Sequence, residues 1–148
     1  MNKKVKKWYK LDNAAKIFPP TVSKKDTKVF RVACELYENV EKDYLQNALN
    51  KTLDEYPLFK SSLKKGLFWY YLETSSINPQ VTLENKKICD QMDNDLLFRV
   101  SFYKKRINLE VHHSLTDGTG IISFLKSLVS NYLINKYNII TLIKERIR

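Results

Sequence analysis

The chain has 148 residues but only three glycines, two histidines and two cysteines. Cys34 and Cys89 are far apart and fit neither a C-x-x-C motif nor zinc-site spacing, so we expect two buried free thiols in a reducing compartment. No apolar run approaches the length needed to cross a bilayer. The basic N-terminus is not followed by the apolar region of a signal peptide, which predicts a cytoplasmic location.

Arginine is also scarce, although the net charge is +10 at pH 7. Lysine outnumbers arginine several-fold, whereas phosphate recognition favours arginine because its planar guanidinium binds in a bidentate manner. We therefore expect no specific nucleic-acid partner, while an acidic or phosphorylated small ligand is compatible with the charge. The apolar and charged fractions, 43% and 28%, are those of one folded domain.

A strand and a helix are predicted after a basic lead-in over residues 1–28. Residues 29–36 are rich in Val, Phe and Cys without a breaker, which favours a strand. Asn39 is the expected N-cap of the helix that follows, because apolar residues then recur at helical spacing. Pro57 ends that helix.

An aromatic run after the helix belongs to a predicted hairpin. Residues 58–63 and 67–72 form two short runs on either side of Gly66, which supplies the turn. The second run, LFWYYL, fits either the wall of a ligand site or a strand buried between a sheet and a helix. We expect the buried strand.

The second half of the chain predicts another hairpin and a second helix. Residues 74–94 are polar and indicate a loop with one edge strand. Residues 96–103 and 107–113 flank a basic turn, and residues 121–133 have the apolar spacing of an amphipathic helix. The order of elements predicts an α+β (mixed α/β) domain with helices packed on a mostly antiparallel sheet.

The stretch VHHSLTDGTG, residues 111–120, contains both histidines. On a strand, alternation places His113 on the apolar face and His112 on the opposite face. The two rings then cannot share a metal ion, and no cysteine or third histidine is nearby, so we expect no metal site. His113 at the strand end fits a general base or a core histidine satisfied by a carbonyl.

Asp117 has a structural interpretation, as the cap of a helix. It precedes Gly118 at the start of the second helix, where a carboxylate caps free N–H groups. Two of the three glycines, Gly118 and Gly120, lie in this turn, which indicates a backbone path that side chains would obstruct.

Residues 112–118 match the motif HHxxxDG in full. The chain therefore resembles the acyltransferase superfamily with the chloramphenicol acetyltransferase fold, which includes the condensation domains of nonribosomal peptide synthetases and the alcohol acetyltransferases. Residues 8–19 and the segments 56–59 and 66–69 look most like the alcohol acetyltransferase branch. The resemblance extends over residues 7–137, and residues 138–148 do not look like the family.

The resemblance implies that His113 is the general base for acyl transfer from acyl-CoA to an alcohol or amine. Acyl-CoA is then a co-substrate, and no cofactor is permanently bound. The alternatives are a condensation-like domain that acts on carrier-bound acyl groups and a non-catalytic remnant. In family members the aspartate of the motif forms an ion pair with a basic side chain, so the resemblance implies a structural role for Asp117. Lys60 is its expected partner here, with Arg99 or Arg31 as substitutes.

Full family members have two such lobes in tandem, with the substrate tunnel between them. The chain is thus expected to be the N-terminal lobe alone, inactive or self-associating without a C-terminal lobe. His113 is expected to open onto a shallow, one-sided cleft.

Overall fold

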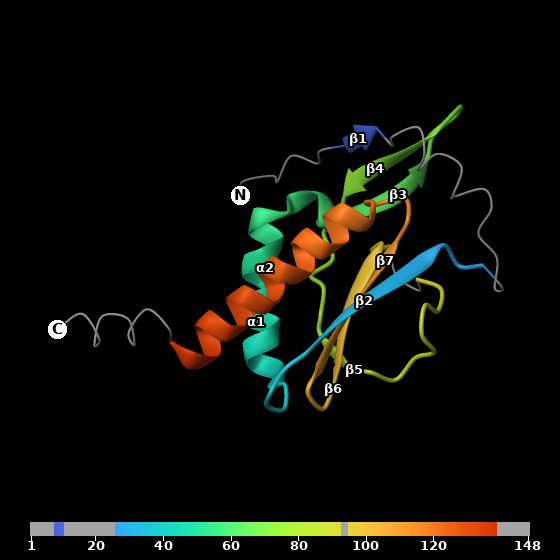
Figure 1. Cartoon of the computed structure of the whole chain (residues 1–148). Coiled ribbons are helices and arrows are strands. Elements are labelled where there is room, and N and C mark those ends of the chain that lie inside the picture. Colours follow the sequence, from blue (N-terminus) through green and yellow to red (C-terminus); the bar gives the residue numbers. More distant parts are fainter. Residues whose placement is uncertain (1–7, 11–25, 93–94, 139–148) are drawn as a thin grey trace.

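The computed structural model describes residues 8–10, 26–92 and 95–138 (Figure 1). Along the chain the elements are β1 (Trp8–Lys10), β2 (Val29–Glu35), α1 (Lys42–Glu55), the 3-10 helix η3 (Pro57–Lys60), β3 (Ser61–Lys65), β4 (Tyr70–Thr74), β5 (Thr82–Leu83), β6 (Phe98–Tyr103), β7 (Arg106–His112) and α2 (Gly118–Tyr137). The prediction of an α+β fold with helices on a mostly antiparallel sheet is confirmed.

The larger sheet has the strand order β2-β7-β6-β5, in which only β5 is parallel to its neighbour. Its register sets residues in rows across three strands: Val32, Leu109 and Val100 form one row, and Arg31, Glu110 and Arg99 form the next. Because cross-strand partners point to the same face, one face of this sheet is apolar and the other carries charges.

The core lies between the apolar face and the two helices. Helix α2 lies across β2 and β7 and packs against α1 (Figure 1). The buried side of α1 consists of residues at helical spacing: Leu45, Ala48, Leu49, Thr52 and Leu53. From α2, Phe124 stacks on Phe59 with ring centroids 4.0 Å apart, which joins the helices to the segment before β3.

The first hairpin is present, but its strands are β3 and β4 rather than residues 58–63 and 67–72. Pro57–Lys60 forms η3, because proline at the first position starts a helical turn readily. The aromatic residues 67–69 lie in the loop between the strands and are exposed, so the prediction that they form a buried strand is wrong.

Other boundaries differ less from the predictions. Helix α1 begins at Lys42 with Glu41 at the N-cap, so Asn39 is not the cap. The second hairpin, the edge strand β5 and helix α2 are where the sequence predicts them. Cys34 and Cys89 are free, as predicted, but both are partly exposed rather than buried.

The basic lead-in contains a short strand, β1, which was not predicted from the sequence and which pairs with β4. The rest of residues 1–25, and the tail after Asn138, lie outside the described residues. Within the described ranges, no helix is long and apolar enough to cross a membrane.

Candidate active site at the end of strand β7

The two histidines lie where β7 leaves the sheet. The amide of His112 donates to the carbonyl of Leu97 on one side, and the amide of His113 donates to the carbonyl of Lys28 on the other, each at 2.8 Å. The amide of Leu115 then donates to the carbonyl of His112 at 3.0 Å, which closes the turn toward α2. Both backbone positions are therefore held by the residues that directly precede β6 and β2.

The two rings lie on opposite faces of the sheet, as the alternation predicts. The ring of His113 stacks on Phe30, with centroids 4.3 Å apart and an interplanar angle of 26°. Phe30 is opposite Val111 in the register, so His113 lies on the apolar face. His112 lies on the other face, in the same series as Glu110.

His112 is held in one tautomer. Its side chain is 6% exposed, and its Nδ1 accepts a hydrogen bond from the amide of Ser114 at 3.1 Å. The hydroxyl of Ser114 lies 2.7 Å from the same nitrogen. Since an amide N–H can only donate, Nδ1 is unprotonated and the neutral ring carries its proton on Nε2. His112 therefore has no free basic nitrogen with which to accept a proton.

The electrostatics agree with this assignment. Burial, assisted by the neighbouring His113, lowers the pKa of His112 to about 4. The pKa of His113 is also below its ordinary value, because of burial and the positive charge of Lys28, with Asp26 acting in the opposite direction. Lys28 and Asp26 themselves form an ion pair. His113 is only partly buried, and at neutral pH its ring is uncharged.

A cavity of about 360 Å³ is present at this end of β7. It is lined by Thr27, Leu63, Gln91, Met92, Asp95, Leu97 and His112. The cavity thus lies on the side of His112, whereas the cleft was expected at His113. Phe30 covers one face of the His113 ring, and the cleft expected at His113 stays a prediction.

Asp117 caps helix α2. Its backbone is extended, and its Oδ1 accepts a hydrogen bond from the amide of Gly120 at 2.9 Å. Among the described residues Asp117 forms no ion pair, so the expected pair with Lys60 is absent. The substitutes Arg31 and Arg99 are also engaged elsewhere, since both bind Glu110.

Of the two glycines in this turn, only Gly120 requires the absence of a side chain. A Cβ at Gly120 would lie 1.8 Å from the hydroxyl oxygen of Thr116, whereas a Cβ at Gly118 would meet nothing within 4 Å. The expectation that both glycines serve a crowded backbone therefore holds for Gly120 and is wrong for Gly118.

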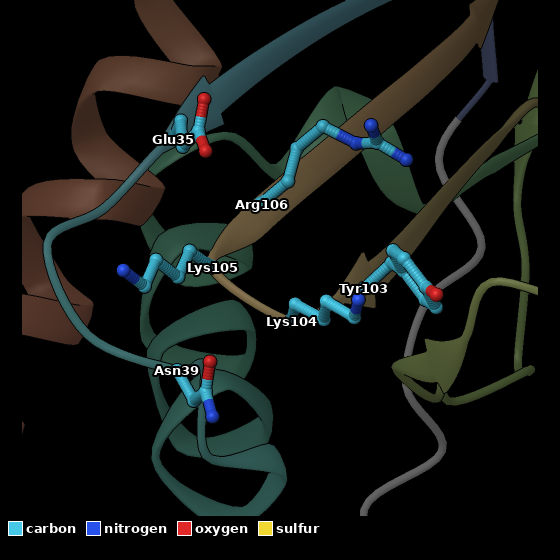
Figure 2. A pocket seen from close by; sticks show the side chains of 6 residues that line it. All are labelled: Glu35, Asn39, Tyr103, Lys104, Lys105 and Arg106. Atoms are coloured by element: carbon cyan, nitrogen blue, oxygen red, sulfur yellow. The ribbon is translucent and has the colours of Figure 1, made fainter.

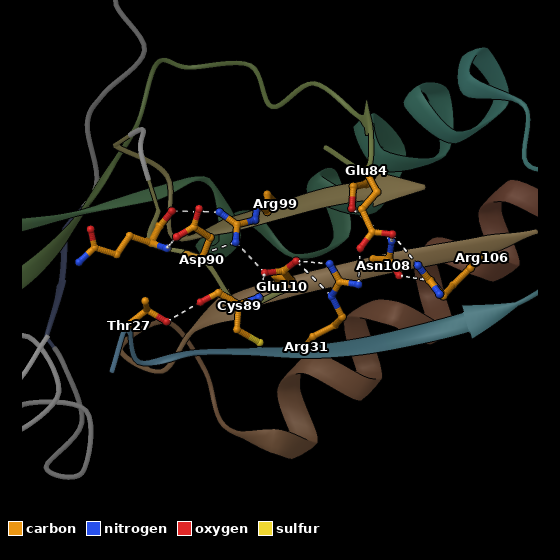
Figure 3. Close-up of polar contacts among 11 residues, drawn as sticks. Thr27, Arg31, Glu84, Cys89, Asp90, Arg99, Arg106, Asn108 and Glu110 are labelled. Atoms are coloured by element: carbon orange, nitrogen blue, oxygen red, sulfur yellow. Dashed lines mark hydrogen bonds and ion pairs between the residues drawn. The ribbon is translucent and has the colours of Figure 1, made fainter. Parts of the chain in front are cut away.

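A buried ionic cluster holds the opposite face of the sheet (Figure 3). Glu110 is 2% exposed and lies between Arg31, at 2.5 Å, and Arg99, at 2.6 Å. Arg31 also binds Glu84 at 2.7 Å, and the amide of Cys89 donates to Glu110 at 2.9 Å. This cluster fixes β2, β6 and β7 beside the histidines.

This ionic cluster was not predicted from the sequence. The available signal was Glu110, a lone carboxylate in the middle of a predicted strand of otherwise apolar and neutral residues. A charged side chain in that position needs a partner when it is buried. Arg99 lies opposite Glu110 in the β6–β7 hairpin, whereas Arg31 is distant in sequence and is brought to Glu110 only by the pairing of β2 with β7.

A second cavity, of about 270 Å³, lies at the other end of β7 (Figure 2). Its cations come from the β6–β7 turn and the start of β7: Lys104, Lys105 and Arg106. Figure 2 shows that the side chains of Lys105 and Arg106 point in different directions, so they do not converge on one ligand. Among the described residues, no group of three or more His, Cys, Asp or Glu could hold a metal ion.

No family model matches the chain, and no curated protein matches it in sequence. Solved structures do resemble its fold. The starter condensation domain of rhizomide synthetase RzmA superposes with a TM-score of 0.68 at 13% identity, over 89% of this chain and 39% of that one. The epimerization domain of the third module of tyrocidine synthetase B gives 0.67 at 10% identity, over 90% and 36%.

A third similar structure is polyketide synthase associated protein 5 from Mycobacterium tuberculosis. Its TM-score is 0.61 at 17% identity, over 85% of this chain and 32% of that one. At these identities the likeness shows a shared fold, that of condensation-domain-like proteins. The chain spans between about a third and two fifths of the length of these three structures.

Proposed function

We propose that the chain is the N-terminal lobe of an acyltransferase in which His113 is the general base. The acyl donor is an acyl-CoA thioester, and the acceptor is a small alcohol or amine. The observation that carries this proposal is the contrast between the two rings: His112 is locked through Nδ1, whereas His113 is partly exposed and uncharged at neutral pH.

The proposed step needs one proton acceptor. His113 takes the proton from the hydroxyl or amine of the acceptor molecule. At the same time the oxygen or nitrogen of the acceptor bonds to the carbonyl carbon of the thioester. The tetrahedral intermediate then collapses, the C–S bond breaks, and the thiolate leaves with the proton returned by His113. Burial, together with the Lys28 charge, lowers the pKa of His113 and favours the neutral form that this step requires.

The fold likeness also favours a second candidate, in which the acyl group is bound to a carrier protein. One similar structure is described as a starter condensation domain, and another as an epimerization domain. The same base serves both candidates, since both involve the attack of a nucleophile on a thioester. They differ in the donor, which an assay with free acyl-CoA and with an acylated carrier protein distinguishes.

The test is thiol release from acetyl-CoA with a panel of alcohols and amines. Because the similar structures are longer, the chain is assayed alone and after mixing with a separately produced C-terminal lobe. We expect His113→Ala to lower transfer by about 10²- to 10⁴-fold, the range for a general base. His112→Ala is the matched control. When the rate is corrected for the lower stability of this variant, it should lose much less transfer activity than His113→Ala.

Each outcome selects one candidate. Release from acetyl-CoA that depends on His113 supports the acyl-CoA donor, and release only from an acylated carrier supports the condensation-like candidate. Equal rates of thiol release in the parent chain and His113→Ala, with either donor and with the second lobe present, would indicate that the chain is a non-catalytic domain.

A further inference from the structure

The loop between β3 and β4 exposes three large apolar side chains that are consecutive in sequence. Leu67, Phe68 and Trp69 are 89%, 82% and 59% exposed, and together we call them the aromatic tip. The rings of Phe68 and Trp69 lie 6.3 Å apart, so they form one patch rather than separate side chains. Scattered apolar residues on a surface need no explanation, but a contiguous patch on a projecting loop does.

The loop projects and has a defined backbone. Figure 1 shows the β3–β4 hairpin extending beyond the helices, with the loop at its outer end. The amide of Gly66 donates to the carbonyl of Trp69 at 2.7 Å, which closes the loop. A Cβ at Gly66 would lie 2.9 Å from that carbonyl oxygen, so only glycine allows this closure without a shift. The aromatic tip is therefore presented by a specific turn.

Two lysines lie just before the aromatic tip in the sequence. Lys64 and Lys65 precede the loop, and Lys65 is exposed. From position 61 to position 72 the hairpin contains no carboxylate. The whole chain carries a net charge of +10. A surface that combines exposed aromatic side chains with adjacent lysines complements an apolar layer that lies beneath anionic groups.

We propose that the aromatic tip is a membrane-contact site that inserts into the interface of an anionic lipid surface. Trp and Phe favour the boundary between headgroups and acyl chains, and the two lysines lie where they reach the lipid phosphates. A second copy of the chain is a poorer occupant, because contact between two tips would bring their lysines together. This inference is independent of the acyltransferase proposal.

The test is co-sedimentation of the full chain with vesicles. We expect binding to vesicles of phosphatidylcholine mixed with phosphatidylglycerol, and at least about tenfold weaker binding to phosphatidylcholine alone. The variant with Leu67→Ser, Phe68→Ser and Trp69→Ser should lose at least about tenfold in partitioning, because binding scales with buried apolar area. Charge reversal by Lys64→Glu with Lys65→Glu should cause a similar loss.

The matched control is Tyr37→Ser, because Tyr37 is 99% exposed but lies in the connection between β2 and α1. Its binding should equal that of the parent chain. Insertion is followed by the emission of Trp69 in a Trp8→Phe background, which should shift to the blue when mixed vesicles are added. The far-ultraviolet circular dichroism of the triple serine, charge-reversal and Tyr37→Ser variants should match that of the parent chain, because their changed side chains lie outside the core.

Three results would overturn the proposal. The first is undiminished vesicle binding by the triple serine variant, which would mean that general charge attraction acts alone. The second is equal binding to both kinds of vesicle. The third is absence of vesicle binding together with self-association that the triple variant abolishes in sedimentation velocity, which would make the aromatic tip a protein contact.

Discussion

The two faces of strand β7 are both buried, but one carries apolar side chains and the other carries polar side chains. On one face Ile107, Leu109 and Val111 are completely buried against the helices, and the series ends at His113, which is only partly covered. On the other face Asn108, Glu110 and His112 are also buried but polar, and each is held by hydrogen bonds. The apolar face ends in a histidine that is partly exposed, and the polar face ends in a buried histidine whose Nδ1 is already hydrogen-bonded.

This difference shows that burial and polarity alone do not identify a functional histidine. His112 is the more buried ring, has the more strongly lowered pKa and lines a cavity. These features are common at functional sites. Its Nδ1 is nevertheless committed to Ser114, so its position is explained by structure. For His112, the hydrogen-bond partners of Nδ1 decide the matter.

The largest expected effect on stability is at Glu110, which anchors the polar face. Glu110→Ala leaves the partly buried Arg31 and Arg99 without their common buried partner and should reduce the free energy of unfolding by about 3 kcal/mol. Glu35→Ala, at the exposed end of β2, is the control and should change it by less than about 0.5 kcal/mol. Urea denaturation of both variants makes the measurement. Equal midpoints would show that the cluster does not hold the sheet.

The next effect is the pH dependence that His112 contributes. The unfolded chain binds a proton at this ring below pH 6.5, whereas the folded ring stays neutral down to about 4. The free energy of unfolding should therefore decrease as the pH falls through this window, by about 3 kcal/mol in total. Denaturation curves at a series of pH values should show a much smaller decrease for His112→Gln, and His113→Gln should keep most of it.

A smaller effect is expected in the turn that connects both histidines to α2. Gly120→Ala should destabilise the fold by about 1–3 kcal/mol, since the new methyl group overlaps the side chain of Thr116. Gly118→Ala places its methyl group in open space and should be neutral or slightly stabilising. Thermal melting of this pair of variants is the measurement. The reverse order of stabilities would contradict the assignment of Gly120 as the crowded position.

The smallest effects are expected at Asp117. Asparagine caps a helix as well as aspartate does, so Asp117→Asn should leave the melting temperature almost unchanged. Asp117→Ala removes the acceptor for the amide of Gly120 and should cost about 1 kcal/mol. A large loss in Asp117→Asn would instead indicate that the charge itself has a partner.

The sequence predicts the fold class and the opposite placement of the histidines well, because both follow from short-range periodicity. Alternation along residues 107–113 depends only on strand geometry. The ionic cluster could not be predicted, since Arg31, Glu84 and Glu110 come from separate elements whose register is set by packing. The exposed aromatic tip was missed for a related reason, because a run of apolar residues indicates burial unless the turn is placed correctly.

The most direct test of the account is a pH titration of both histidine rings by nitrogen-15 nuclear magnetic resonance. The chain has only two histidines, so His112→Gln assigns the signals without ambiguity. We expect His112 to remain the Nε2–H tautomer and to titrate with a pKa of about 4, while the pKa of His113 is lowered by a smaller amount. If instead His112 titrates at the higher pH, or its Nδ1 carries the proton, the assignment of His113 as the proton acceptor is contradicted.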